Sequence, residues 1–239
     1  MADPYPRIVD DGLVRLAIEL SEHAREAIDG HAALLLAWTA AINLTAIRDP
    51  EGVARLHVLD SLAAVPLLRD AGIRAFVDLG SGGGYPGIPL AAALDLDDVL
   101  LVDSVGKKAR FLETAAEATG LAPRLRVAAV RAEQLARDPD HRERWEAVTA
   151  RGVASLPELA ELAMPLLVPG GLLVAWKRVP LDDELASLAS LPAGLGAGVP
   201  EVLPVSVLGL EDHRLVVVAK TGRTADRWPR DPAERRRSR

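Results

Sequence analysis

The stretch with the clearest chemical signature is VDLGSGGGYPGIPL, residues 77–90. An apolar run reaches Asp78 and is followed by Gly80, Gly82, Gly83, Gly84 and Gly87. A glycine-rich turn between a strand and a helix lets the backbone approach a ligand where no side chain would fit. The turn therefore predicts a ligand site, and its neighbours have to indicate which ligand.

Two classes of ligand match this spacing. Gly82, Gly84 and Gly87 satisfy G-x-G-x-x-G, and Asp103 ends the next apolar run, as in dinucleotide-binding folds. Asp78 discriminates between the classes, because a carboxylate at short range would repel a pyrophosphate. It suits S-adenosyl-L-methionine, which carries an ammonium and a sulfonium but no phosphate, with Asp103 accepting from the ribose hydroxyls. A NAD-dependent oxidoreductase is the alternative.

Short apolar runs alternate with helical patterns from residue 75 onward, which is typical of a parallel sheet covered by helices. Strands are expected over 75–79, 99–103, 126–130, 147–150, 172–176, 202–208 and 214–219. Helices are expected over 88–94, 106–119, 132–137, 157–167 and 181–188. We therefore predict an α/β fold with a doubly wound sheet, mostly parallel with a C-terminal antiparallel hairpin. With S-adenosyl-L-methionine as the ligand, this is a Rossmann-like class I methyltransferase sheet.

The first 70 residues are helical in pattern. Apolar spacing over 11–42 predicts two helices that break near Gly30, and Asp49-Pro50 predicts a capped helix that runs to Arg69. Three regions follow: an N-terminal helical extension packed on the core (1–70), a methyltransferase domain (71–220) and a basic, flexible tail (221–239).

Composition limits the partners. The chain has 239 residues, no cysteine, no long apolar run and a net charge of -6, so we expect a cytoplasmic protein without a membrane span. No metal site is expected. Charge is uneven, because residues 220–239 carry +5 and the rest -11. Such a tail is compatible with docking on RNA or with a merely solvated end, and both readings stay open.

Several further segments carry a family resemblance. They are NLTAIRDP (43–50), LDSL (59–62), PGIP (86–89), LVDSVGKKARFL (101–112), ARGVAS (150–155), WK (176–177) and LVVV (215–218). With these segments the chain resembles the ribosomal RNA small subunit methyltransferase G family, also called glucose-inhibited division protein B, over about residues 40–220.

The resemblance implies methylation of N7 of a guanine in 16S rRNA within the small ribosomal subunit, with S-adenosylmethionine as methyl donor. It also implies that Gly80, Tyr85, Ala132, Glu133 and Arg151 contact the donor or its surroundings. All five follow the carboxyl ends of predicted strands, where ligands bind in open α/β sheets. A methyltransferase that acts on a small molecule and a non-enzymatic RNA-binding factor are further alternatives, and a monomer is favoured.

Catalysis at N7 needs no general base, since this nitrogen carries a lone pair and no proton. The candidates are accordingly positioning residues: Arg151, Lys177, His57 and Asp60. His57 and Asp60 have i, i+3 helical spacing, which fits either a surface ion pair or a role in holding substrate. For Arg151 the alternative is an ion pair with an acid such as Asp78.

The other aromatic residues and histidines are assigned from their position in the sequence. Tyr85 and Trp176 are candidates to stack on a splayed-out guanine. We expect the imidazoles of His23, His31 and His141 to be exposed to solvent and not catalytic.

The sequence departs from the family pattern at two places. The family has arginine and histidine before its Asp-Ser pair, whereas this chain has Leu56-His57 with Arg55 as the nearest arginine. In the final hairpin the order of arginine and histidine is exchanged, as His213-Arg214. Both departures affect expected RNA contacts or packing and leave the donor site unchanged.

Overall fold

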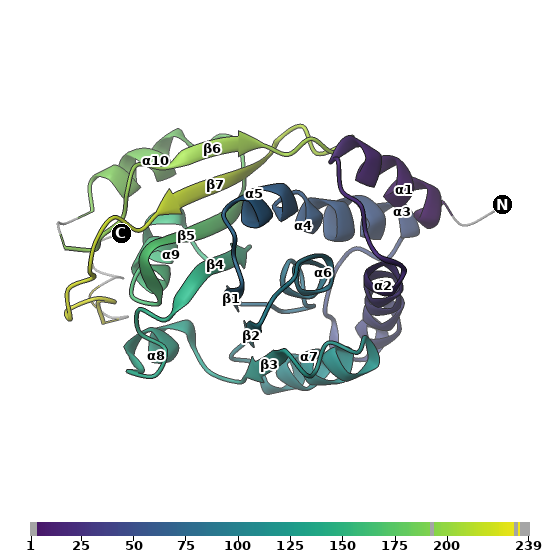
Figure 1. The fold of residues 1–239 in the computed structure, drawn as a ribbon, viewed down its shortest axis with the longest axis horizontal. Coiled ribbons are helices and arrows are strands. Elements are labelled where there is room, and N and C mark those ends of the chain that lie inside the picture. Colours follow the sequence, from purple (N-terminus) through teal and green to yellow (C-terminus); the bar gives the residue numbers. More distant parts are fainter. Residues whose placement is uncertain (1–3, 192–193, 232–233, 235–239) are drawn as a thin grey trace.

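In the computed structural model, which describes residues 4–191, 194–231 and 234, one sheet has the strand order β3-β2-β1-β4-β5-β7-β6 (Figure 1). Its strands are β1 (Ala75–Leu79), β2 (Asp98–Val102), β3 (Leu125–Ala128), β4 (Trp145–Arg151), β5 (Leu167–Arg178), β6 (Glu201–Pro204) and β7 (His213–Ala219). Strands β1 to β5 pair in parallel, and β7 is antiparallel to both its neighbours. The predicted fold class is confirmed.

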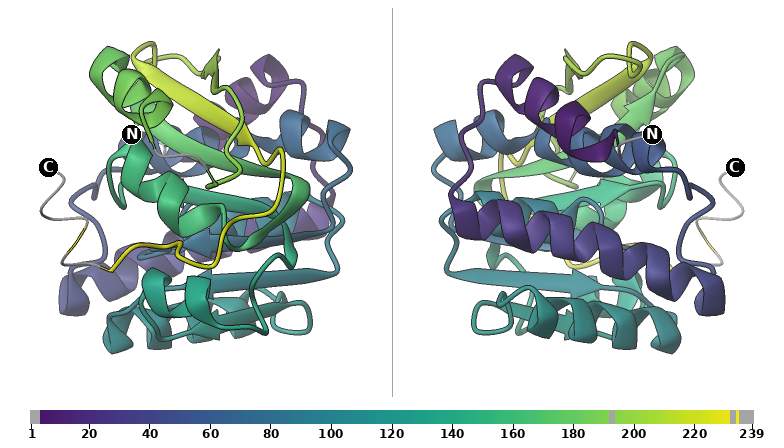
Figure 2. Two further views of the ribbon diagram at one scale, coloured as in Figure 1. Left: turned by 90° about the vertical axis from the view of Figure 1, so that its left-hand side faces the viewer. Right: turned by 90° about the vertical axis from the view of Figure 1, so that its right-hand side faces the viewer.

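Helices cover both faces of this sheet (Figures 1 and 2). They are α1 (Tyr5–Arg15), α2 (Glu22–Ile42), α3 (Pro50–Gly52), the π-helix η1 (Val53–Leu59), α4 (Asp60–Leu62), α5 (Val65–Asp70), α6 (Gly87–Ala93), α7 (Gly106–Ala118), α8 (Ala132–Arg137), α9 (Leu156–Ala163) and α10 (Asp182–Ala189). In the described part of the chain, no helix has the length and apolar character required to cross a membrane.

The core has two halves because strand side chains alternate between the faces. Along β1, Phe76 joins the cluster beneath α2, α6 and α7, whereas Val77 and Leu79 join the cluster beneath α8 and α9. Asp78 has the same parity as Phe76 and therefore points toward the α6 face. This register decides where the acid before the glycine loop lies.

The predicted helix break at Gly30 is wrong. Helix α2 runs through Gly30, and the break lies before Glu22, where the Ser21 side chain accepts a hydrogen bond from the Ala24 amide. A Cβ at Gly30 would meet nothing within 4 Å, so this glycine is an exposed helical position. Such a glycine costs the helix only about 1 kcal/mol relative to alanine, which a strong N-cap and tertiary packing offset.

The predicted helix from Pro50 starts as expected, with the Asp49 carboxylate accepting from the Gly52 amide at 2.7 Å. It does not continue unbroken to Arg69. Residues 53–59 are wound as a π-helix, and the helix ends at Leu62 before α5 begins. π-Windings are frequent at functional sites, and this one contains His57 and precedes Asp60.

The C-terminal segment differs from the predicted flexible tail as far as the structure describes it. Residues 221–231 run along the face covered by α8 and α9 (Figure 2, left). Trp228 is 1% exposed, and Arg142 donates to the carbonyl oxygens of Thr224 and Trp228. The buried Lys220 pairs with Glu143 at 2.8 Å. Residues 235–239, with four of the predicted basic side chains, lie outside the described residues.

Replacing Trp228 by alanine therefore lowers the free energy of unfolding by roughly 3 kcal/mol, the usual cost of deleting a buried large aromatic. Urea denaturation measures this change. Val199→Ala is the control, because Val199 is 91% exposed and its truncation is expected to change stability by less than about 0.5 kcal/mol. Equal stability of Trp228→Ala and Val199→Ala would mean that the segment is not packed.

Candidate functional site

The glycine loop after β1 has a backbone that only glycine adopts easily. Gly80, Gly82 and Gly84 have φ values of 67°, 54° and 85°, in the left-handed region. A Cβ on Gly84 would lie 2.6 Å from Ile88 Cδ1 and 2.8 Å from His31 Nε2. Gly82 differs, since its Cβ would meet only ordinary contacts at 3.7 Å and beyond. The loop is therefore tightly packed beneath Gly84 and has free space at Gly82.

Asp103 holds this loop from the neighbouring strand. Its Oδ2 accepts from the Gly82 amide at 3.0 Å, and its Oδ1 accepts from the Val105 amide at 2.8 Å. Ser81 adds a second link, because its hydroxyl donates to the Asp78 carbonyl and accepts from the Val102 amide. The end of β2 thus fixes the shape of the loop.

Asp78 lies beneath the loop and not against a cavity. The side chain is fully buried, Oδ1 accepts from the Thr149 hydroxyl at 2.7 Å, and Oδ2 has no hydrogen-bond partner. Burial raises the pKa of Asp78 to about 6. The sequence predicts a direct contact between Asp78 and a ligand. The structure does not support this contact, because the register of β1 turns the carboxylate toward α6. A Cβ on Gly87 would lie 2.9 Å from Oδ2.

Tyr85 lies between two imidazole rings. The His31 ring centroid is 4.4 Å from that of Tyr85, and His57 stacks on Tyr85 at 4.7 Å with an interplanar angle of 15°. The Arg151 guanidinium lies 5.6 Å from the Tyr85 ring centroid. This stack joins α2, the glycine loop, η1 and the end of β4.

His31 was expected to be solvated, and that expectation is wrong. It is fully buried, and its Nε2 donates to the Gly83 carbonyl at 2.8 Å. Burial lowers the pKa of His31 to about 3 and, together with Arg151, that of His57 to about 4. Both imidazoles are consequently neutral at physiological pH, and the stack carries no charge besides Arg151.

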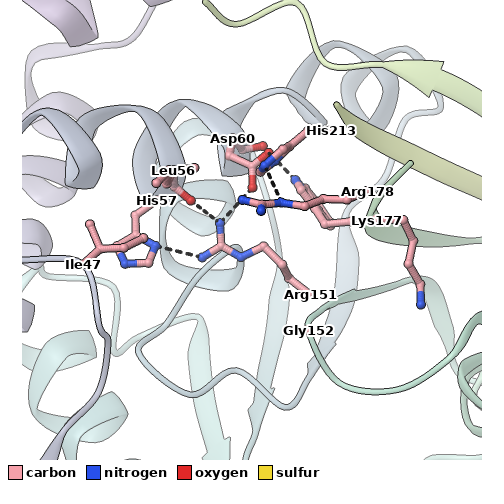
Figure 3. Close-up of a pocket in the computed structure, with 10 residues that line it drawn as sticks. Ile47, Leu56, His57, Asp60, Arg151, Gly152, Lys177, Arg178 and His213 are labelled. Atoms are coloured by element: carbon pink, nitrogen blue, oxygen red, sulfur yellow. Dashed lines mark hydrogen bonds and ion pairs between the residues drawn. The ribbon is translucent and has the colours of Figure 1, made fainter. Parts of the chain in front are cut away.

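A second cluster centres on the carboxylate of Asp60, which is 1% exposed (Figure 3). Its Oδ2 accepts from Arg151 at 3.0 Å and its Oδ1 from His213 Nδ1 at 2.9 Å. The Trp176 indole donates to the Asp60 carbonyl at 2.7 Å. Figure 3 shows Arg151 between Asp60 and His57. This Asp60 cluster therefore ties the η1–α4 helix to the ends of β4, β5 and β7.

Arg151 also reaches the π-helix. One terminal nitrogen donates to the Leu56 carbonyl at 2.8 Å, and the other donates to His57 Nδ1 at 3.2 Å. The Asp60 amide bonds to the Arg55 carbonyl, five residues earlier, and not to that of Leu56. Since arginine only donates, His57 Nδ1 must accept, so Nε2 carries the hydrogen and donates to the Thr45 hydroxyl at 2.8 Å.

Two adjoining cavities meet at these residues. The glycine-loop cavity, of about 220 Å³, is lined by Gly80, Ser81, Gly82, Gly83, Tyr85, Lys108, Leu35, Leu44 and Thr45. The Asp60 cavity, of about 360 Å³, is lined by Ile47, Leu56, Asp60, Trp176, Lys177, Arg178 and His213. His57, Arg151 and Gly152 line both. These three residues therefore form the boundary between a ligand in one cavity and a ligand in the other.

The sequence-predicted candidates are only partly brought together. Arg151, His57, Asp60, Gly80, Gly82 and Tyr85 line one or both cavities, whereas Asp78 and Asp103 support the loop from outside. Arg151 pairs with Asp60 and not with Asp78, and His57 and Asp60 form no surface ion pair. Lys177 lines the Asp60 cavity, but its Nζ points away from the cluster to the Ala154 carbonyl and Glu184 (Figure 3).

Ala132 and Glu133 lie farther out. They begin α8, beyond the carboxyl end of β3, and line neither cavity. Arg55 is also outside, since it pairs with Glu51 and donates to the Leu208 carbonyl. His213, in contrast, belongs to the Asp60 cluster, although the sequence presented it only as an exchanged pair with Arg214. The available signal was a histidine at the start of a strand that is apolar from Leu215 onward.

Within residues 4–191, 194–231 and 234, no three His, Asp or Glu side chains are grouped as a metal site would require. The site has instead a constrained backbone loop, a neutral aromatic stack and one buried ion pair.

Solved structures with a similar fold are methyltransferases. An O-methyltransferase from Bacillus cereus superimposes with a TM-score of 0.60 and 19% identity over 89% of this chain and 97% of that chain. A SAM-dependent O-methyltransferase from Thermotoga maritima gives 0.55 and 16% over 80% of this chain and 72% of that chain. The fold is thus that of the methyltransferases.

The sequence model of the rRNA small subunit methyltransferase G family matches residues 24–203. A relative from Roseiflexus sp. (strain RS-1), named ribosomal RNA small subunit methyltransferase G, is 40% identical over 89% of this chain and 90% of its own length. A relative of the same name from Rubrobacter xylanophilus is 44% identical over 85% and 80%. The chain belongs to the rRNA small subunit methyltransferase G family.

Removing the Asp60 carboxylate is expected to be costly, because Asp60→Ala leaves the Arg151 cation without its buried partner. We expect a loss of roughly 3 kcal/mol in the free energy of unfolding, measured in urea. The matched control is Asp95→Ala, since Asp95 is 90% exposed and pairs with Arg74, away from the Asp60 cluster. Its loss is expected to stay below about 1 kcal/mol. Similar losses for both variants would contradict a buried cluster.

The depressed pKa of His31 predicts a pH dependence of stability. The unfolded chain takes up a proton near pH 6.5, whereas folded His31 does so only near pH 3, so its contribution is present above pH 6.5 and is lost as pH falls toward 3. His31→Gln keeps a donor for the Gly83 carbonyl but does not titrate.

Between pH 6.5 and 4 the stability of the wild type should therefore fall relative to His31→Gln by roughly 1 kcal/mol per pH unit. Asp78 titrates in the opposite sense, but it is common to both proteins and cancels in the difference. Parallel plots of stability against pH for the two proteins would show that His31 takes up its proton in the same pH range in the folded and unfolded states.

Proposed function

We propose that this protein transfers a methyl group from S-adenosyl-L-methionine to N7 of a guanine in 16S rRNA of the small ribosomal subunit. Family membership supports the rRNA substrate. The observation that carries the proposal is the pair of cavities that meet at His57, Arg151 and Gly152. One lies against the glycine loop, as a donor site should, and the other is open at the carboxyl edge of the sheet, where an acceptor base can enter.

The glycine-loop cavity fits a cationic donor better than a dinucleotide. Buried beneath the loop, Asp78 has one oxygen without a hydrogen-bond partner at the start of α6, where a dinucleotide fold would place its pyrophosphate. A phosphate there would face this carboxylate across a single layer of backbone. The donor's ammonium and sulfonium would be attracted instead. This observation disfavours a NAD-dependent oxidoreductase.

The chain's own groups can be assigned to the two ends of the donor. Gly80 and Gly82 offer backbone at close range to the methionine end, with Asp78 supplying the field from below. Asp103, which fixes the Gly82 amide, and Ala132 and Glu133, which begin the next helix, are proposed for the ribose and adenine end. When bound, S-adenosylmethionine supplies an electrophilic methyl group.

The Asp60 cavity would hold the guanine. Trp176 and the Arg151 guanidinium present flat surfaces on which a splayed-out base can stack, and Lys177 and Arg178 also line this cavity. His57 is neutral and Arg151 is paired with Asp60, so the shared boundary carries little net charge. Positive charge that appears on the purine ring is therefore not opposed there.

No proton has to be removed from N7, so the residues act by alignment. Holding two reactants in line can contribute roughly 7–11 kcal/mol. His57, fixed by Thr45 and Arg151, and Tyr85, fixed between two imidazoles, give the boundary a rigid shape. The methylation rate should accordingly be independent of pH between about 7 and 9. A rate limb near pH 7 that disappears in His57→Asn would contradict this account.

Gly82→Val tests the donor site. The valine side chain would project into the glycine-loop cavity from a residue with φ 54°, so we expect loss of S-adenosylmethionine binding in a calorimeter. Gly72→Val is the matched control, because Gly72 has φ 68°, has nothing within 4 Å of a Cβ and lies before β1, away from both cavities. Equal donor affinity in the two variants would remove the donor from this cavity.

The whole proposal is tested by incubating the protein and labelled S-adenosylmethionine with small subunits that lack the modification. We expect label in 16S rRNA as 7-methylguanosine, and less label on deproteinised RNA. Label on another base, or only on free metabolites as a small-molecule methyltransferase would give, would refute it. A non-enzymatic RNA-binding factor would bind the subunits but transfer no label, and Gly82→Val would leave that binding intact.

A further inference from the structure

Most basic side chains of the described chain are neutralised by acids. Arg25, Arg74, Arg126 and Arg144, among others, pair with aspartates within 3.0 Å. Three of the C-terminal cations that suggested an RNA-binding tail behave in the same way, because Lys220 and Arg223 pair with Glu143 and Arg230 pairs with Glu161. Although the net charge is -6, a few cations among the described residues therefore remain without an acidic partner and are available to bind an anion.

Most of the available cations lie on the segments that follow the carboxyl ends of β2 and β3. In the part of the chain that the structure describes, no ion pair or hydrogen bond is recorded for the charged groups of Arg48, Lys107, Lys108, Arg110 and Arg131, which we call the basic rim. Lys107, Lys108 and Arg110 lie on the first turns of α7, after β2, and Arg131 precedes α8, after β3. Arg15 and Arg69 share this lack of a recorded partner but lie on α1 and α5.

The basic rim adjoins the two cavities. Lys108 lines the glycine-loop cavity, and Arg48 follows Ile47, which lines the Asp60 cavity. Because the carboxyl ends of parallel strands meet at one edge, α7 and α8 begin at the same edge as the glycine loop and Arg151. Lys107, Lys108, Arg110 and Arg131 therefore flank the site on the β2–β3 side, and Arg48 lies beside the Asp60 cavity.

Exposed aliphatic side chains occur at this same edge. Val105, directly before α7, and Val153, after β4, are among the few large apolar residues that are exposed. A Cβ on Gly80 would lie 2.7 Å from Val153, which places Val153 over the glycine loop. Exposed apolar atoms on the same edge as these cations suit a surface that meets sugars and bases as well as phosphates.

The other half of the edge has the opposite charge. Asp182, Asp183 and Glu184 form the first turn of α10, after β5, and Asp212 precedes β7. There the cations Lys177 and Arg178 are paired, with Glu184 and with Asp212. A polyanion is therefore attracted over α7 and repelled over α10.

We propose that the rRNA strand flanking the target nucleotide crosses the basic rim, with its phosphates against Arg48, Lys107 and Arg110, and enters the Asp60 cavity from the α7 side. This inference rests on the proposed function. It assigns RNA docking to the catalytic edge of the sheet and not to the C-terminal segment. The rim supplies charge for phosphates, which position a nucleic acid without reading its sequence.

The test compares two matched charge reversals, Arg110→Glu on the rim and Arg69→Glu on α5. Binding to small subunits and methylation are measured over a range of salt concentrations, with S-adenosylmethionine affinity as the check that each variant is folded. We expect Arg110→Glu to lower kcat/KM and subunit affinity on the order of tenfold at low salt and to reduce the salt dependence. Arg69→Glu should stay within about twofold of the wild type.

Equal effects of the two reversals would overturn the proposal. So would loss of binding on deletion of residues 235–239 with Arg110→Glu unaffected, since RNA would then dock through the C-terminus. An effect of Arg110→Glu on intact subunits that vanishes on deproteinised 16S rRNA would assign the rim to a ribosomal protein instead. Rim-dependent binding without any methylation would refute the proposed function and leave the docking surface standing.

Discussion

The site depends on one buried carboxylate. Asp60 receives hydrogen bonds from Arg151 on β4 and His213 on β7, and its carbonyl receives one from Trp176 on β5. A buried charge is stable only when it is paired and hydrogen-bonded, so the four elements cannot move independently. Held in this way, Arg151 reaches His57 and lies over Tyr85. The boundary between the two cavities is a consequence of this ion pair.

The second constraint is that the glycine loop is supported from both sides. Asp103 holds it from the sheet, and His31 of α2 holds it from the N-terminal helices. Leu35, Leu44 and Thr45, which lie on α2 or just after it, complete the wall of the glycine-loop cavity. The sheet alone therefore does not form the cavity. The helices before β1 are part of the site as well as of the core.

Much of the fold follows from local pattern. Strand β1 and helix α8 lie where the apolar runs and helical spacing predict them, because a sheet buried on both faces needs continuous apolar strands. The helix break was misplaced since glycine at an exposed helical position costs little, while the Ser21 cap decides where α2 starts. The burial of Trp228 could not be predicted, because one tryptophan among charged residues has no periodicity.

For the site, sequence indicated the residues better than their partners. The glycine loop and Asp103 stand out by spacing, and Arg151 and His57 by resemblance. The register of β1, which turns Asp78 away from the cavity, and the pairing of Asp60 with His213, 153 residues away, are tertiary facts. No local pattern encodes them. The same holds for the ion pairs that neutralise Lys220, Arg223 and Arg230.

The central claim is that donor and acceptor occupy two cavities separated by His57 and Arg151. The most direct measurement is a crystal structure with S-adenosylhomocysteine and a guanosine-containing oligonucleotide. The account predicts density for the first ligand along Gly80–Gly83, with its sulfur facing His57 and Arg151, and a guanine in the Asp60 cavity. The account would be contradicted if either ligand bound in the cavity assigned to the other. It would also be contradicted if a dinucleotide displaced S-adenosylhomocysteine from the glycine loop.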